Sequence, residues 1–213
     1  MNPRPIWLLG LALFGLALFG LAFAACGSSL DDKPLEETGQ DGVPVVHIPA
    51  RYAKTLGADL DTLVSTFDVA FVGVVTGEAE QRSELMAGGR GELPVSVFTV
   101  LVEASADAAV VGSTVEVEQL GGITTGGGTR TTQGQGPVRL LMEGDSPIEV
   151  GERYLFIVKE KAPGIYRASP MARFPIESGR LQPAAGWEDL GAAQEIAGLT
   201  VAQAMERVSR SAD

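Results

Sequence analysis

An uninterrupted apolar run near the N-terminus constrains this chain more than any other feature of its sequence. Arg4 is the only charged side chain before Asp31, and residues 6–25 are all apolar or small. A basic start followed by such a run is typical of a secretory signal peptide. At about 1.5 Å per residue, the run is also long enough to cross a bilayer core of roughly 30 Å, so an uncleaved helical anchor remains an alternative.

A single cysteine follows this run directly. The segment Phe23-Ala24-Ala25-Cys26 resembles the bacterial lipobox, with Phe23 in place of the usual leucine. The resemblance implies that residues 1–25 are removed and that Cys26 carries lipid, palmitate included, as the mature N-terminus. It places the protein at the bacterial cell membrane or outer membrane, with its domain facing outside the cytoplasm. Ordinary secretion with a free cysteine is the other alternative. Because the chain has no second cysteine, a disulfide framework is excluded.

The composition after Cys26 predicts a tether and one domain. Residues 26–45 are polar and acidic, with little apolar surface to bury, and we expect a flexible tether. Residues 46–213 have a length suited to one domain with a full hydrophobic core. The formal net charge of −11 becomes more negative when Arg4 leaves with the signal peptide. Such a surface repels nucleic acid, so we expect no nucleic-acid partner.

Hydrophobic patterning predicts a mainly β domain. The run from Val69 to Val75 is apolar on both faces, as in a buried strand. In the stretch 114–119, Val115 and Val117 alternate with Glu116 and Glu118, which predicts a half-exposed strand with the two glutamates in solvent. Further β-rich runs, separated by turn residues, bring the expected number to five or six strands: 95–103, 153–159, 165–168, and 174–176 with Leu181.

Helical periodicity flanks this β-rich region on both sides. Apolar residues of the segment 59–67 recur at helical spacing, with Asp59 available as N-cap. Thr200 and Gln203 form a capping-box pattern before a C-terminal helix with Val201, Met205 and Val208 on one face. A helix packed on the sheet explains that stripe better than a partner-binding face.

The order of these segments resembles exported bacterial proteins with an OB-like barrel. The resemblance covers about residues 59–183 and is carried by the runs 68–77, 98–103, 115–122 and 151–158. It implies a five- to six-stranded barrel similar to the netrin and metalloproteinase-inhibitor modules. Those inhibitors grip a protease zinc through a disulfide-locked Cys-x-Cys, whereas Cys26 is followed here by Gly27 and Ser28. The resemblance therefore predicts shape and not inhibition.

The sequence has no catalytic or metal-binding signature. His47 is the only histidine, which excludes a histidine cluster for zinc and leaves a Ser-His-Asp triad without a nucleophile elbow. The Gly-rich segment 121–136 lacks the lysine of a phosphate-binding loop, since Gly127 stands at that position. A glycosidase pair could use Glu116 and Glu118, but surface charge is the ordinary explanation. We expect no catalytic residue, no metal and no cofactor.

Two function classes remain. The first is a non-enzymatic, membrane-tethered module that binds an envelope protein or a small ligand, and the alternative is an envelope hydrolase using carboxylates near the loop 121–136. Loops carry function more often than the scaffold beneath them. Candidate binding residues are therefore Arg90 in the loop 78–92, and Thr129 and Arg130 in the loop 121–136.

Overall fold

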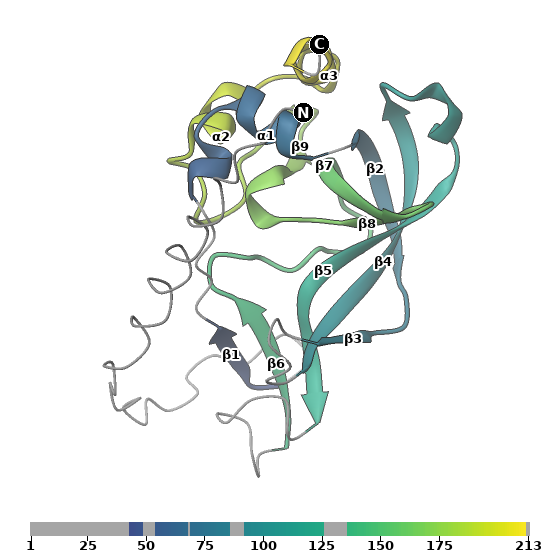
Figure 1. Ribbon diagram of the computed structural model, residues 1–213, viewed down its shortest axis with the longest axis vertical. Helices are drawn as coiled ribbons and strands as arrows, with labels where there is room; N and C mark the ends of the chain where they lie inside the picture. Colours follow the sequence, from purple (N-terminus) through teal and green to yellow (C-terminus); the bar gives the residue numbers. More distant parts are fainter. Residues whose placement is uncertain (1–42, 49–53, 68, 86–91, 126–135, 212–213) are drawn as a thin grey trace, which may run out of the picture. The chain divides into compact units, whose positions relative to one another are not determined.

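Strands make up most of the regular structure. The computed structural model describes residues 43–48, 54–67, 69–85, 92–125 and 136–211. The chain divides into two units, Met1–Pro34 and Leu35–Asp213, and every described residue belongs to the second. The expectation of a mainly β chain with a helix near the C-terminus is confirmed (Figure 1).

The elements follow one another from β1 to α3 along the described ranges. The strands are β1 (Val45–Ile48), β2 (Val69–Glu78), β3 (Arg82–Leu85), β4 (Glu92–Ser105), β5 (Thr114–Thr125), β6 (Pro137–Met142), β7 (Arg153–Ala162), β8 (Ile165–Arg167), β9 (Arg173–Glu177) and β10 (Arg180–Leu181). The helices are η1 (Lys54–Gly57), α1 (Leu60–Thr66), η2 (Ala108–Val110), η3 (Pro170–Ala172), α2 (Gly191–Ile196) and α3 (Val201–Ser211).

One sheet joins these strands in the order β1-β6-β5-β4-β2-β7-β9-β10. The short strand β8 pairs on one side with β5, in parallel, and on the other with β7, antiparallel. The antiparallel pairs β5–β4, β4–β2 and β2–β7 complete a circuit of hydrogen-bonded neighbours. β3 pairs with the first residues of β4, beyond the end of β2.

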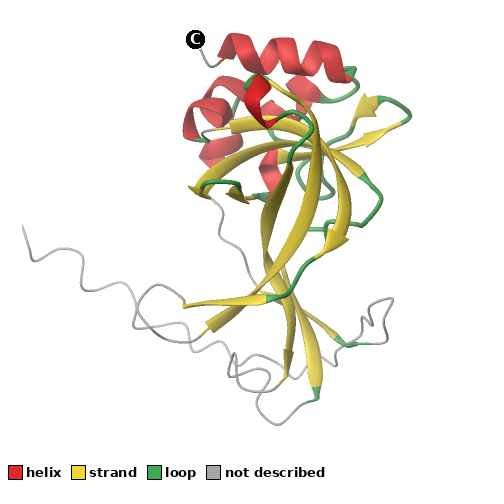
Figure 2. Ribbon diagram, turned by 90° about the vertical axis from the view of Figure 1, so that its right-hand side faces the viewer, coloured by secondary structure: helices red, strands yellow, loops and turns green. Residues whose placement is uncertain are grey.

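The sheet separates two hydrophobic clusters. One is built from residues of β2, β4, β5, β7 and β8, among them Phe71, Val117 and Phe156. The other lies between the sheet and the helices, which gather beside one end of the strands (Figure 2), and includes Val72 and Leu155. Strands β2 and β7 contribute alternate residues to both clusters, which explains why their sequences are apolar on both faces.

The two predicted helices have the predicted caps. The Asp59 carboxylate accepts a hydrogen bond from the backbone N–H of Thr62 at 2.6 Å, so it is the N-cap of α1. At α3, the side chain of Gln203 accepts from the Thr200 N–H at 3.0 Å, and the Gln203 N–H donates to the Thr200 hydroxyl at 3.4 Å. Val208 is buried in the hydrophobic cluster between the sheet and the helices, as expected of a packed helix. In the described ranges, no helix has the length and apolar character needed to cross a membrane.

The structure adds elements that the sequence patterns do not predict. β1, β3 and β6 come in addition to the expected strands, and the first five residues of the segment expected to form the loop 121–136 continue β5 instead. The reason is pairing: residues 121–125 of β5 pair with β6, which in turn pairs in parallel with β1. β3 likewise lies within the segment 78–92 that was expected to be a loop.

Candidate functional site

The outward face of β5 carries two glutamates whose surroundings differ. Val115 and Val117 are buried in the hydrophobic cluster that includes Phe71, as predicted. Glu116 is partly exposed, with 36% of its side chain accessible, whereas only 6% of the Glu118 side chain is accessible. The expectation that both glutamates lie in solvent is therefore wrong for Glu118, because cationic side chains from three other strands cover it.

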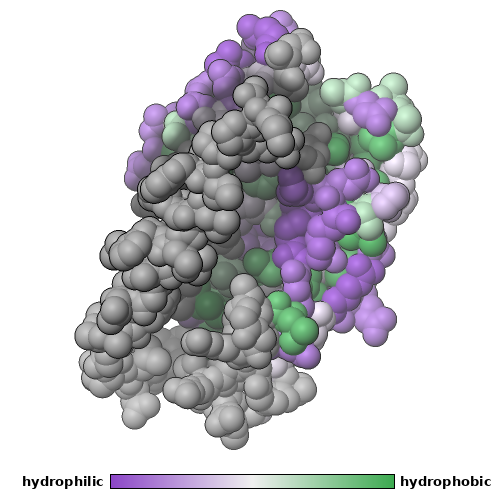
Figure 3. Space-filling view, in the orientation of Figure 1, coloured by the Kyte–Doolittle hydropathy of each residue, from purple (hydrophilic) through white to green (hydrophobic). Residues whose placement is uncertain are grey.

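Six charged side chains from β3, β5, β7 and β8 form what we call the ionic cluster. Its members are Arg82 and Glu84 of β3, Glu116 and Glu118 of β5, Lys161 of β7 and Arg167 of β8. Hydrophilic residues gather over β5 and β8 on the face seen in Figure 3. The cluster holds three acids and three bases, so it is electrically balanced within an acidic chain.

Glu118 is the centre of the ionic cluster. Its carboxylate accepts hydrogen bonds from Lys161 Nζ at 2.8 Å and from Arg167 Nη2 at 2.8 Å and Nε at 3.3 Å. Arg82 Nη1 donates to it at 3.4 Å. Three strands therefore supply cations to one buried carboxylate. These cations offset the free-energy cost of burying its negative charge.

The strand β3 supplies the outer members of the cluster. Arg82 Nη2 donates to Glu116 at 2.7 Å. Glu84 accepts from Arg167 Nη2 and lies 3.5 Å from Lys161 Nζ. These contacts connect β3 to β5, β7 and β8, so they hold β3 against the outward face of the sheet.

The cluster fixes the protonation of its carboxylates. Burial alone raises the pKa of Glu118, but the hydrogen bonds from Lys161 and Arg167 and their charges bring it below its ordinary value. The hydrogen bond from Arg167 holds the pKa of Glu84 below its ordinary value, against the smaller effect of burial. Both groups are ionised at neutral pH, which suits the binding of charge and not the donation of a proton.

Replacing Glu118 with glutamine tests the role of this carboxylate in stability. A folded-state pKa below the ordinary value of 4.5 contributes stability above that value, and the contribution is lost as the pH falls through the folded-state pKa. We expect Glu118→Gln to lower the free energy of unfolding by about 1 kcal/mol at pH 7. The difference from the wild type should shrink below about pH 4.5. Urea denaturation of both proteins across this pH range measures it, and a difference independent of pH would contradict the assignment.

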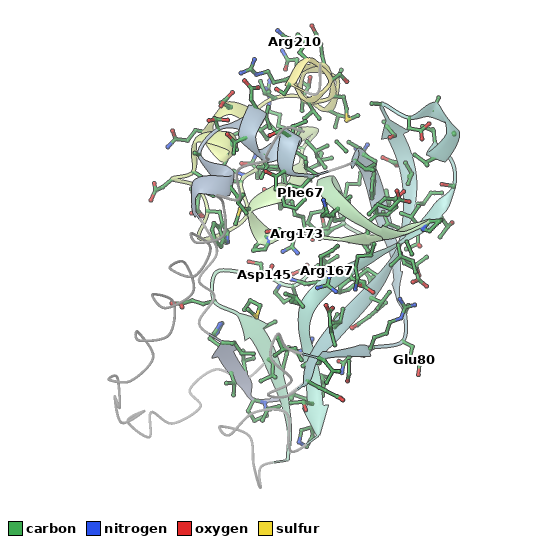
Figure 4. All side chains as sticks on the ribbon, viewed as in Figure 1. Phe67, Glu80, Asp145, Arg167, Arg173 and Arg210 are labelled. Atoms are coloured by element: carbon green, nitrogen blue, oxygen red, sulfur yellow. The ribbon has the colours of Figure 1, made fainter. Side chains whose placement is uncertain are left out.

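A second polar group lies on the other side of β5 and is buried. Arg173 of β9 and Asp145, which follows β6, point toward one another (Figure 4), with 3.0 Å between Arg173 Nη2 and Asp145 Oδ1. Each side chain is 2% exposed. Gln119 of β5 donates to Asp145 Oδ1 and to the Ser146 carbonyl, both at 2.8 Å, and accepts from the Ile148 N–H at 3.0 Å. Together these contacts fasten the segment between β6 and β7 to the sheet.

Burial dominates the electrostatics of this pair. It raises the pKa of Asp145 above its ordinary value, although the Arg173 charge and the Gln119 hydrogen bond act in the opposite direction. The Arg173 guanidinium lies over the ring of Tyr154, 5.8 Å from its centroid, a cation–π contact. Its Nε and Nη1 atoms are buried and make no hydrogen bond to any residue that the structure describes. The pair is a buried structural anchor, since protein closes around it.

The predicted lipidation and binding residues fall in ranges that the structure does not describe. Cys26, Arg90, Thr129 and Arg130 are outside the described residues. His47 is exposed on β1, where its backbone pairs with Leu141 of β6. Among the described residues, no three histidine, cysteine, aspartate or glutamate side chains are grouped to hold a metal ion. The grouping of the ionic cluster is not predicted by the sequence, although Arg82 and Glu84 belong to the segment 78–92 in which binding residues were expected.

No family model matches the chain, and neither a curated protein nor a solved structure was found to match it.

Proposed function

We propose that this protein is a lipid-anchored lipoprotein of the bacterial cell envelope, whose domain is a non-enzymatic binding module with an OB-like barrel. Its ligand is an envelope protein or a small molecule, and the ionic cluster is its binding face. The anchor is supported by the apolar run 6–25 followed by Cys26. The lipid would keep the domain at the membrane surface, where its partner is met.

The strand pairing supports the OB-like barrel. The circuit of paired strands is β2-β4-β5-β8-β7-β2. If these five strands are numbered in chain order, this circuit is 1-2-3-5-4-1. The third and fifth are parallel and the other pairs antiparallel, as in OB folds. One hydrophobic cluster takes residues from all five strands, as the interior of a small barrel would.

The position of the ionic cluster is the observation that carries the binding function. OB folds bind ligands on the outer face of the second and third strands, next to the connection between the first and second. Here these strands are β4 and β5, and the connection contains β3. Glu116, Glu118 and Arg82 occupy that face. The ionised, paired state of Glu84 and Glu118 fits a binding surface better than a hydrolase that needs a protonated acid.

Substitution of Cys26 tests the anchor. The membrane-extracted wild-type protein should have an intact mass that lacks residues 1–25 and includes acyl chains. Cys26→Ser should lose the acyl chains, because a thiol is the acceptor that the lipobox supplies. An uncleaved and unmodified mass for both proteins would instead establish a helical anchor and contradict lipidation.

Photo-crosslinking tests the binding face. A photoreactive benzoylphenylalanine in place of Lys161, whose side chain is 40% exposed in the ionic cluster, should give a discrete crosslinked product in intact cells. The same group at Arg210 of α3, on the exposed surface of the helix, is the matched control. Equal products from both positions, or none from Lys161, would count against the ionic cluster as the binding face.

A further inference from the structure

One cation of the ionic cluster, Arg82, can be displaced into solvent, because its side chain is not buried. Arg82 is 44% exposed, and it bonds to Glu116 at 2.7 Å and to Glu118 at 3.4 Å. Lys161 and Arg167 stay on Glu118 when Arg82 is removed, each at 2.8 Å. Of the three cations, Arg82 alone contacts Glu116. Displacing Arg82 would therefore free the Glu116 carboxylate and one approach to Glu118.

Apolar side chains lie beside this ion pair on the same face of the sheet. Val97 is the cross-strand partner of Glu118, and Val95 is the partner of Arg82, so all four side chains project to one side. Val95 and Val97 are almost completely buried, yet they belong to neither main hydrophobic cluster. A ligand replacing the Arg82 side chain would meet both carboxylates, with these two valines on the same side of the sheet.

The charge of the whole chain selects the kind of ligand. With a formal net charge of −11, the protein attracts cations over a long range and repels anions. A guanidinium group matches a carboxylate in shape and can donate two parallel hydrogen bonds, whereas an ammonium group acts as a point charge. An arginine from a partner could therefore reproduce the contacts that Arg82 now makes.

We propose that Arg82 of β3 occupies a binding site for an arginine side chain of a basic protein segment from a partner. The partner's arginine would displace Arg82 and pair with Glu116 and Glu118. This inference depends on the proposed binding function, whose partner it specifies as a cationic polypeptide. Arg82 acts as an internal competitor that keeps the face closed until such a segment arrives.

Binding of a labelled hexa-arginine peptide to the membrane-extracted full chain tests this inference, with fluorescence anisotropy as the readout. Arg82→Ala should bind the peptide about two- to fivefold more tightly than the wild type, because the competitor is gone. Glu116→Gln should bind more weakly than the wild type. Hexa-lysine should bind less well than hexa-arginine, and added salt should weaken all these interactions.

The control is Arg210→Ala, which also removes one exposed positive charge but lies on α3. If Arg82→Ala and Arg210→Ala raise the affinity equally, net charge explains the effect and the inference is wrong. Unchanged affinity in folded Arg82→Ala would overturn it as well, and the thermal transition of each variant establishes that it is folded. A crosslink from position 161 together with no binding of hexa-arginine would reject this partner while retaining the proposed function.

Discussion

Asp145→Leu is expected to lower the free energy of unfolding by about 3–5 kcal/mol, because it removes the oxygen that accepts from Arg173 and Gln119 and leaves the guanidinium buried without a counter-charge. Both side chains are 2% exposed, so solvent cannot replace the lost partner. Within the described ranges, two guanidinium nitrogens make no hydrogen bond, which leaves the charge dependent on Asp145 and on the Ser146 carbonyl. For a chain of this size, we expect the melting temperature to fall by about 2–4 °C per kcal/mol. Urea denaturation at pH 7.5 measures the change.

The opposite substitution, Arg173→Met, should behave differently with pH. It leaves a buried carboxylate, which can take up a proton, whereas a guanidinium cannot lose one. The pKa of Asp145 is already raised by burial, and losing the Arg173 charge raises it further. A raised folded-state pKa makes the folded state relatively more stable at low pH, and that advantage is lost as the pH rises through it.

These signs separate the two variants. The cost of Arg173→Met should shrink between pH 7.5 and pH 5, while the cost of Asp145→Leu should not shrink. The double variant Asp145→Leu/Arg173→Met should recover much of the loss, because an apolar pair leaves no buried charge. Near-wild-type stability of Asp145→Leu at pH 7.5 would mean that the pair contributes little to the folded state.

The strands that sequence patterns predict are those whose burial is decided locally. The run from Val69 to Val75 is apolar throughout, and the structure places Phe71 and Val72 in different hydrophobic clusters on the two sides of β2. Val115 and Val117 alternate with glutamates, and they do belong to the hydrophobic cluster that includes Phe71. In these cases each residue type reports its own surroundings.

The candidate site could not be predicted because its surroundings come from distant parts of the chain. Glu116 and Glu118 occupy equivalent places in one alternating pattern, yet only Glu118 is buried. The difference arises from Lys161, which is 43 residues away from Glu118, and from Arg167, which is 49 residues away. The pair Asp145 and Arg173 is likewise 28 residues apart, with no local periodicity to join them. For β6, the alternation of Val138 and Leu140 was a usable signal.

Gly73→Ala is expected to lower the free energy of unfolding by about 2–3 kcal/mol, because β2 and β4 approach closely there. A Cβ atom at Gly73 would lie 2.4 Å from Val100 Cγ1 and 2.8 Å from the Leu101 carbonyl oxygen. The valine could turn, but the carbonyl belongs to the backbone of β4, so relief requires the strands to separate. That separation would disturb the hydrophobic cluster to which Val100 belongs.

Gly77→Ala is the matched control within the same strand. A Cβ atom there meets no atom of the described residues within 4 Å, and neither glycine has the positive φ that would itself disfavour alanine. Because alanine restricts the unfolded chain more than glycine does, Gly77→Ala should leave stability within about 0.5 kcal/mol of the wild type or raise it slightly. Urea denaturation of the two variants side by side decides the matter. Equal losses would mean that the cost comes from replacing any glycine in β2, whereas a loss confined to Gly73→Ala would establish that contact between β2 and β4 limits this position.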